Sequence, residues 1–243
     1  MPRKVIADSV HPESLQLQPK YKFLSIQTTE KLHAIHFEVY GVFKRGMDLV
    51  FAVALLVFLS PLFLVTAVAV KIDSPGPVFF RQKRTGRGGR EFEILKFRSM
   101  VAGNDVMDVF CADRYTRVGK FIRRTSTDEL PQLLNVLLGQ MSFVGPRPWV
   151  PEYFANMNAQ ERRRTRVRPG ITGLAQVKGR NGISIFQKIG YDLEYVENYS
   201  LWQDVKVAML TVKTVLTGES VDAGKGGVQD DIAALGKENR VVN

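Results

Sequence analysis

The sequence has few of the residues on which several common kinds of site depend. Its 243 residues include one cysteine, Cys111, so no disulfide can form within the chain and a reducing compartment is expected. The three histidines, His11, His33 and His36, all lie in the N-terminal part, which argues against a histidine-based active site or a zinc site. The sequence also lacks internal repeats and recognisable nucleic-acid motifs.

Acidic residues are the minority among the charges. Lys and Arg number 34 against 24 Asp and Glu, a formal net charge of +10. Nucleic acid often binds such a chain, but the longest run of like charge is only Arg162–Arg164, so we expect no nucleic-acid partner. Next to an apolar segment, positive charge indicates anionic lipid headgroups or phosphorylated substrates.

The N-terminal part shows no targeting signal and little apolar character. Met1–Lys4 is not followed by an apolar run, so we expect no cleavable signal peptide. Residues 1–28 are polar without a clear period and predict a loosely ordered arm. In residues 29–47 apolar side chains recur at steps of three and four, which predicts an amphipathic helix at a membrane interface.

The longest apolar run is Leu49–Val70, with 22 residues and no charge. About 20 helical residues are needed to cross a hydrocarbon core of ~30 Å. Ser60 and Pro61 interrupt the run, and each half, at about 1.5 Å per residue, reaches only the middle of the bilayer. Basic residues flank both ends, and such residues stay cytoplasmic. This favours a re-entrant segment over a kinked span or a buried helix of a soluble core.

Two apolar stretches, 78–80 and 92–97, enclose a glycine-rich segment at 85–90. This pattern predicts a β-hairpin. Basic residues near the turn suit a phosphate, although the turn itself needs glycine. Lys96 and Arg98 alternate with one apolar residue and so share a face, which indicates either an anion site or the solvent side of the hairpin.

The remaining chain is predicted to be mostly helical, so the fold class is α+β with a small hairpin. Helices are expected in the segment after Pro131 and over 151–166, 184–198 and 201–217, the last amphipathic, with a short helix at 229–236. The predicted parts are an arm and interfacial helix (1–47), a re-entrant membrane helix (48–72), a catalytic domain (73–220) and a C-terminal tail (221–243).

Asp128 and Glu129 form the most interesting acidic pair. Ser126 and Glu129 have the spacing of a helix capping box, which is a purely structural interpretation. The same position suits catalysis, because a carboxylate at a helix N-terminus should have a lowered pKa. With Arg123 nearby, Asp128 is then a candidate nucleophile toward phosphorus, and Glu129 a candidate acid, base or metal ligand. Mg²⁺ is the expected metal for a diphosphate.

Arg147 lies between Pro146 and Pro148. Proline restricts the backbone on both sides, so the guanidinium is held in one direction. Arginine binds phosphate through a planar fork of donors. The segment therefore predicts either a phosphate-binding arginine or an ordinary surface turn.

Six motifs occur in one order along the chain. They are SP at 60–61, DSPGPVFF at 73–80, KFRSM at 96–100, RTSTDELPQ at 124–132, SFVGPRP at 142–148 and PGITG at 169–173. Together they resemble the bacterial sugar transferase family, the monotopic phosphoglycosyl transferases, over about residues 42–220.

This resemblance implies transfer of a phospho-sugar from a UDP-sugar to undecaprenyl phosphate, with release of UMP. It implies that Asp128 is the nucleophile and a ligand of Mg²⁺, with Glu129 as its dyad partner. Lys96, Arg147 and Arg123 match the basic residues of the phosphate site. The location implied is the cytoplasmic face of the bacterial inner membrane, where exopolysaccharide, O-antigen, capsule or glycoprotein glycan assembly begins.

Several alternatives stay open at this point. Asp128 could serve Mg²⁺ alone in a direct single displacement, or the chain could be an inactive membrane scaffold of a glycan assembly complex. The chain resembles the minimal catalytic form of the family and carries about 40 further residues before the membrane segment and 23 after Ser220. The sugar is not readable from the sequence, and neither is the oligomeric state, for which a homodimer is one option.

Overall fold

The computed structural model describes residues 19–101, 114–179, 183–216 and 228–241. By its internal contacts the chain divides into two units, residues 1–39 and 40–243. The second unit contains every candidate catalytic and phosphate-binding residue. It is mostly helical with two small sheets, as the α+β prediction requires.

The first helix, α1, is longer than the sequence suggests. It runs without interruption over Pro19–Phe58. Residues 19–28 belong to it, so the predicted loosely ordered arm is wrong for these residues, and the rest of that arm lies outside the described residues. The helix also continues through residue 48, where we expected the membrane segment to begin.

Asp48 lies on the part of α1 that belongs to the second unit and makes a tertiary contact there. Its carboxylate is buried and accepts hydrogen bonds from the Ser142 hydroxyl and the Phe143 N–H, at 3.1 and 3.2 Å. A buried polar group needs such partners, since leaving it unpaired costs about 1–3 kcal/mol. Residue 48 is therefore a tertiary contact of α1 and not the start of an element.

The helix break predicted at Ser60 and Pro61 is confirmed. α1 ends at Phe58, α2 spans Ser60–Asp73, and the two meet at a bend of 64°. Pro61 has no N–H, so the Val57 carbonyl loses its helical partner. The Ser60 hydroxyl donates to that carbonyl at 2.8 Å and so satisfies it.

Among the described residues, no single helix has the length and apolar character needed to cross a membrane. The bent pair formed by Ala34–Phe58 and α2 reaches that length and character only when its two parts are taken together. A broken span and a re-entrant loop share this shape, so the shape alone does not distinguish them.

The predicted hairpin is confirmed. β1 (Phe79–Thr85) and β2 (Glu91–Phe97) pair antiparallel and are joined through η2 (Arg87–Gly89). Gly88 and Gly89 have φ angles of 66° and 79°, a region that glycine enters without steric strain. The glycine-rich segment therefore has a conformational role in the turn.

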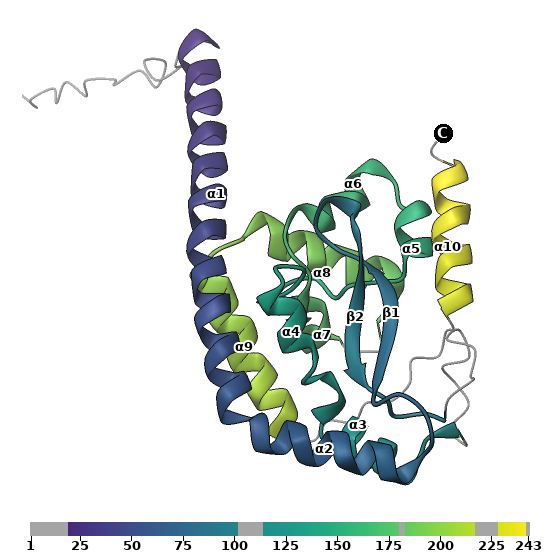
Figure 1. Ribbon diagram of the computed structural model, residues 1–243. Helices are drawn as coiled ribbons and strands as arrows, with labels where there is room; N and C mark the ends of the chain where they lie inside the picture. Colours follow the sequence, from purple (N-terminus) through teal and green to yellow (C-terminus); the bar gives the residue numbers. More distant parts are fainter. Residues whose placement is uncertain (1–18, 102–113, 180–182, 217–227, 242–243) are drawn as a thin grey trace, which may run out of the picture. The chain divides into compact units, whose positions relative to one another are not determined.

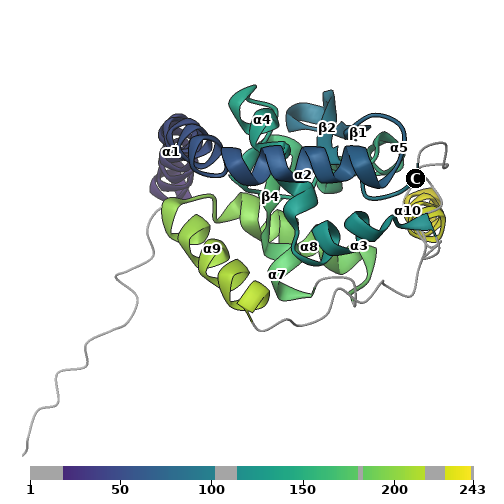
Figure 2. The ribbon, with the colours of Figure 1, turned by 60° about the horizontal axis from the view of Figure 1, so that its bottom comes forward.

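α2 packs against the hairpin and against α3 (Arg117–Arg124). Figure 2 shows α2 lying across one end of the unit, next to both elements. Val70, Phe97 and Ile122 are buried together at this junction. Phe97 follows Lys96 in the sequence, and Ile122 precedes Arg123. The cluster therefore holds the backbone beside two predicted site residues.

A second sheet, which the sequence analysis does not predict, joins β3 (Ser142–Val144) to β4 (Gly170–Thr172) in parallel. The two backbones approach closely at Gly145 and Gly170. A Cβ atom added at Gly145 would lie 2.4 Å from the Arg168 carbonyl oxygen. Glycine is required here by contact distance, and the motifs SFVGPRP and PGITG meet through this sheet.

Residues 151–166 were predicted as one charged helix, which is wrong. They form α5 (Pro151–Ala155), α6 (Ala159–Arg162) and η5 (Arg163–Arg166). Asn158 begins a new helix because its side chain and that of Glu161 form a reciprocal capping box. The signal for this start was present in the sequence, inside the stretch taken as continuous.

The other predicted helices are confirmed. The structure has α4 (Gln132–Leu137), α8 (Ile185–Glu197) and α9 (Leu201–Leu216), together with a short α7 (Leu174–Lys178) that was not predicted. α10 spans Val228–Val241, longer than the helix expected at 229–236. It packs against α5, where Leu235 is buried and Asp231 accepts a hydrogen bond from the Tyr153 hydroxyl at 3.2 Å.

α9 lies alongside the second half of α1 (Figure 1). A buried polar cluster joins them, in which the Asp204 carboxylate pairs with Lys44 and accepts hydrogen bonds from Tyr40 and Tyr195, both at 2.5 Å. The side chains of Lys44 and Asp204 are only 6% and 10% exposed. The charge on each is therefore balanced almost entirely by the other.

Replacing Asp204 with Asn should strongly destabilise the protein. Removing one member of a buried ion pair leaves the other charge uncompensated, which costs about 3–5 kcal/mol. We expect the free energy of unfolding of Asp204→Asn to fall by about that amount, measured by unfolding in detergent micelles. Glu197→Gln is the control, because its 3.4 Å pair with Arg163 is largely exposed and should matter by about 1 kcal/mol or less. Equal losses in both variants would contradict the prediction.

Candidate active site

The segment that carries the acidic pair is a short turn between α3 and α4. It forms η4 (Thr127–Glu129), and Ser126 before it has a φ of 56°, the one positive φ of a non-glycine residue in the described chain. The Ser126 side chain makes no capping hydrogen bond, so the predicted capping box is wrong. Strained backbone of this kind persists where surrounding structure holds it, often at functional sites. Here the positive φ of Ser126 turns the chain after the end of α3, so Asp128 and Glu129 lie in the turn that comes next to that helix.

Glu129 is held by two basic residues from distant segments. Lys96 Nζ lies 2.5 Å from Glu129 Oε1, and Arg147 Nη2 lies 3.6 Å from the same oxygen. Burial by itself raises the pKa of Glu129, but the charges of Lys96 and Arg147 outweigh it and lower the pKa to about 2. Glu129 is therefore an anion at every physiological pH.

Asp128 has the opposite character. It is only 8% exposed, and burial raises the pKa of its carboxyl above the ordinary value, although Lys96, Arg123 and Arg147 oppose that shift. We predicted that the pKa of Asp128 would be lowered, but it is raised. Desolvation of the charged carboxylate outweighs the attraction of the nearby basic side chains. Arg123 lies with its guanidinium 4.9 Å from the Tyr115 ring centroid, which restrains its position.

The loop that carries Arg147 is fixed through its backbone at every residue from 145 to 149. The partners, in order, are the Thr172 carbonyl, the Gly170 N–H, the Arg164 guanidinium, the Arg84 guanidinium and the Thr85 N–H, at 2.9, 3.0, 2.7, 3.4 and 2.8 Å. The Arg147 side chain itself remains 47% exposed. A rigid backbone with an accessible guanidinium is suited to binding an anion from solution.

Arg164 and Asp192 support this loop and were not singled out in the sequence. They form a buried ion pair with an N–O distance of 2.6 Å. The Arg164 guanidinium also lies 3.8 Å from the Trp149 ring centroid. The run of three arginines at 162–164 gave no sign that the last one is buried, because that depends on α8.

Asn135 is a third residue that the sequence analysis did not identify. It lies on α4 and is 1% exposed, and its side-chain amide forms hydrogen bonds with the backbone of β2. It donates to the Glu93 carbonyl at 2.7 Å and accepts from the Leu95 N–H at 3.0 Å. This contact fixes α4, and the acidic turn directly before it, against the strand that carries Lys96.

Arg98 does not belong to the site. It is 5% exposed and donates to the Ser74 and Pro75 carbonyls at 2.7 and 2.8 Å, just after the end of α2. For Lys96 and Arg98 we predicted either a shared anion site or the solvent side of the hairpin. Both predictions are wrong for Arg98, which is buried against backbone carbonyls. Lys96, by contrast, does lie at the acidic pair.

A divalent cation fits the donors at this site only with help from a substrate. Among the described residues, no three His, Cys, Asp or Glu side chains group in a way that could hold a metal. Glu129 is already occupied by Lys96, which leaves the Asp128 carboxylate. Mg²⁺ is commonly bound by one or two carboxylates together with substrate phosphates, so this donor set suits Mg²⁺ when a diphosphate is present.

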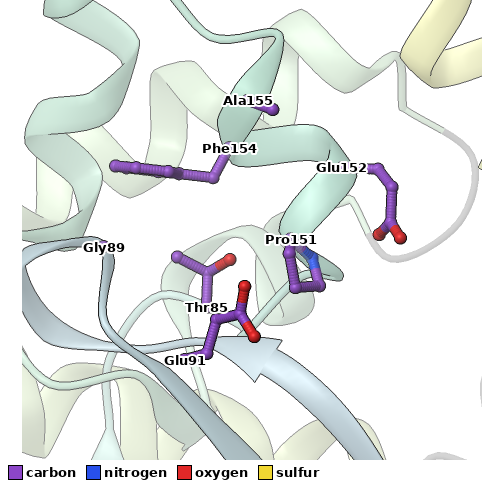
Figure 3. Close-up of a pocket in the computed structure, with 7 residues that line it drawn as sticks. All are labelled: Thr85, Gly89, Glu91, Pro151, Glu152, Phe154 and Ala155. Atoms are coloured by element: carbon purple, nitrogen blue, oxygen red, sulfur yellow. The ribbon is translucent and has the colours of Figure 1, made fainter.

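A cavity of about 360 Å³ lies elsewhere, between the turn end of the hairpin and α5 (Figure 3). Its walls include the Phe154 ring, Thr85 and the Glu91 carboxylate. Among the described residues, no hydrogen bond or ion pair joins its lining to Asp128 or Glu129, so this cavity is separate from the candidate site.

Comparison with known proteins identifies relatives over most of the chain. The family described as bacterial sugar transferase matches residues 39–218. A UDP-glucose:undecaprenyl-phosphate glucose-1-phosphate transferase of Caulobacter vibrioides is 45% identical over 189 residues, covering 73% of this chain and 71% of that protein. A UDP-N-acetylgalactosamine-undecaprenyl-phosphate N-acetylgalactosaminephosphotransferase of Aeromonas hydrophila is 44% identical, covering 74% and 45%. An uncharacterized sugar transferase of Bacillus subtilis is 43% identical, covering 74% and 90%.

Replacing Asp128 with Asn should stabilise the fold. Because burial raises the pKa of Asp128, its ionisation disfavours the folded state at any pH above its ordinary pKa of 3.8. We therefore expect Asp128→Asn to raise Tm at pH 7, and the difference to disappear as the pH falls below about 3.8, where the carboxyl is protonated in both states. Glu93→Gln, at an exposed acid, should leave Tm unchanged. A lower Tm for Asp128→Asn at pH 7 would contradict this assignment.

Proposed function

The chain belongs to the bacterial sugar transferase family, and we propose that it transfers a phospho-sugar from a UDP-sugar to undecaprenyl phosphate, releasing UMP. The names of the Caulobacter and Aeromonas relatives support this reaction class. The observation that carries the proposal is the buried Asp128 carboxylate beside Glu129, whose own carboxylate is held by Lys96 and Arg147. The product, a diphosphate-linked sugar on a lipid, is the first membrane intermediate of glycan assembly.

In the first half-reaction, Asp128 attacks the β-phosphorus of the UDP-sugar. A bond forms between an Asp128 carboxylate oxygen and phosphorus, and the bond from phosphorus to the bridging oxygen breaks. The electron pair of that bond stays on the bridging oxygen, which leaves as part of UMP. No proton is needed, because the carboxylate and the diphosphate together carry the same charge as the phospho-enzyme and UMP.

The electrostatics support different tasks for the two carboxylates. A desolvated carboxylate with a raised pKa is more basic, and so a better nucleophile once ionised, than one paired with cations. This describes Asp128. Glu129 holds Lys96 and Arg147 beside the reacting phosphate, where preorganised cations stabilise the developing charge.

In the second half-reaction, a phosphate oxygen of undecaprenyl phosphate attacks the phosphorus of the phospho-enzyme. The bond between Asp128 and phosphorus breaks, and the carboxylate is regenerated. Asp128 and the diphosphate oxygens would hold Mg²⁺ during the first half-reaction. When bound, Mg²⁺ supplies positive charge that offsets the charge of the leaving phosphate.

The acceptor phosphate lies at the level of lipid headgroups, so the site must lie there too. α2 exposes large apolar residues, among them Leu64, Val65 and Ile72, and α1 exposes Val57 and Phe58 next to the break. An exposed apolar surface of this kind supports insertion into a bilayer. We place the bent pair in the cytoplasmic leaflet of the bacterial inner membrane as a re-entrant segment that sets the depth of Asp128.

Asp128→Asn should abolish turnover, because an amide cannot form the phospho-enzyme. We expect UMP release to fall by at least about a thousandfold. Intact-mass spectrometry of the wild type with UDP-sugar and no acceptor should show an added phospho-sugar, which Asp128→Asn should lack.

Glu93→Gln is the matched control for this test and should behave as the wild type. Initial rates with both substrates should give parallel lines. Intersecting lines without an adduct would show direct single displacement, and no UMP release from any UDP-sugar would show that the chain is not a transferase.

The re-entrant arrangement places both ends of the bent pair on one side of the membrane. With Cys111 replaced by Ser, single cysteines at Lys20, Arg87 and Lys225 should all be shielded from an impermeant reagent in intact cells. They should all become reactive in inverted vesicles. Labelling of the residue 20 cysteine alone in intact cells would show a spanning segment instead.

A further inference from the structure

Arg84 has no role in the reaction as described so far. It lies on β1 and donates to the Gln82 side-chain oxygen at 2.5 Å and to the Pro148 carbonyl at 3.4 Å. Its Nε is buried and has no hydrogen-bond partner among the described residues. A buried donor without a partner is unusual in a folded protein and calls for an explanation, such as a ligand that completes it.

The register of the hairpin places Arg84 in line with Lys96. Lys96 is directly opposite Phe80, and residues 80, 82 and 84 of β1 point to the same face as their partners on β2. Four residues along a strand correspond to roughly 13 Å. Arginine and lysine side chains are long, so their charged ends can converge over part of this separation and face neighbouring phosphates of one diphosphate.

Arg147 lies between these two cations. Its side chain reaches Glu129 beside Lys96, while the carbonyl of the next residue, Pro148, accepts the hydrogen bond from Arg84. Burial, and then the charge of Arg147, lower the pKa of Arg84 to about 10. Two guanidinium groups whose charges repel each other are stabilised by an anion that lies near both.

We propose that Arg84 binds the α-phosphate of the UDP-sugar, and therefore holds the nucleotide that leaves as UMP. This inference rests on the proposed function. Lys96 and Arg147 then face the β-phosphate at Asp128, with Arg147 shared between the two phosphates. The α-phosphate gains one negative charge when the bridging oxygen departs with UMP, so a cation there stabilises the leaving group.

A purely structural role for Arg84 makes a different prediction. If Arg84 only supported the Pro148 backbone, its loss would misplace Arg147 and slow both half-reactions. If it binds the nucleotide, only steps that involve UMP should change, because the second half-reaction takes place after UMP has left.

The test compares Arg84→Gln with the wild type as full-length protein in detergent or nanodiscs. We expect single-turnover UMP release to slow by about tenfold or more, and equilibrium binding of UMP to weaken by a similar factor. Phospho-enzyme accumulated over a long incubation and freed of nucleotide should discharge to undecaprenyl phosphate within about twofold of the wild-type rate.

Two further variants make the result specific. Lys83→Gln is the matched control, since Lys83 is the neighbouring cation on the other face of β1, is 71% exposed and pairs with Glu91. It should leave both half-reactions and UMP binding unchanged. Arg84→Lys retains a charge and should recover UMP binding in part, which guards against a folding defect in Arg84→Gln.

Unchanged UMP binding in Arg84→Gln, or equal slowing of both half-reactions, would overturn the role of Arg84. These results are distinguishable from failure of the proposed function, in which the wild type itself would release no UMP and form no phospho-enzyme. That outcome would overturn both proposals, whereas an active wild type with an unaffected Arg84→Gln would overturn this one alone.

Discussion

The Glu129 carboxylate is the point at which three distant segments of the chain meet. Lys96 comes from the hairpin, Arg147 from the loop after β3, and Glu129 itself from the turn after α3. Without this shared anion, two cations would lie together in a partly buried site with no balancing charge. Two further contacts hold these segments in place. Asn135 binds the backbone of β2 and so fixes the acidic turn, and the Arg164 guanidinium donates to the carbonyl of Arg147.

Two adjacent carboxylates acquire opposite properties from their surroundings. Glu129 is paired and has a pKa of about 2, whereas Asp128 is desolvated and has a raised pKa. Pairs of titratable groups whose environments separate their pKa values commonly divide the tasks of a reaction. In the proposed reaction, the same separation makes Glu129 a fixed support for cations and Asp128 the reactive group. The burial that raises the pKa of Asp128 also reduces the stability of the fold, a trade-off common at active sites.

Two predictions that depended on local chain chemistry agree with the structure, whereas the capping box predicted from Ser126 and Glu129 does not form. The break at Ser60 and Pro61 follows from a missing N–H, and the hairpin follows from glycines that permit positive φ. Predictions that required knowledge of burial did not succeed. Arg98 lies at the end of α2 and not in the site, and the pKa of Asp128 is raised and not lowered. In both cases the deciding neighbours are far away in the sequence.

By itself, the sequence determined the identity and order of the candidate site residues, the family resemblance, and the helix break and hairpin turn that depend on proline and glycine. The tertiary structure decided which of the two carboxylates is desolvated, which basic residues reach it and which are used for support. It also brought Arg84 into line with Lys96 and Arg147. The reason is physical: helix breaks and turns depend on a few neighbouring residues, whereas desolvation and charge pairing depend on which segments pack together.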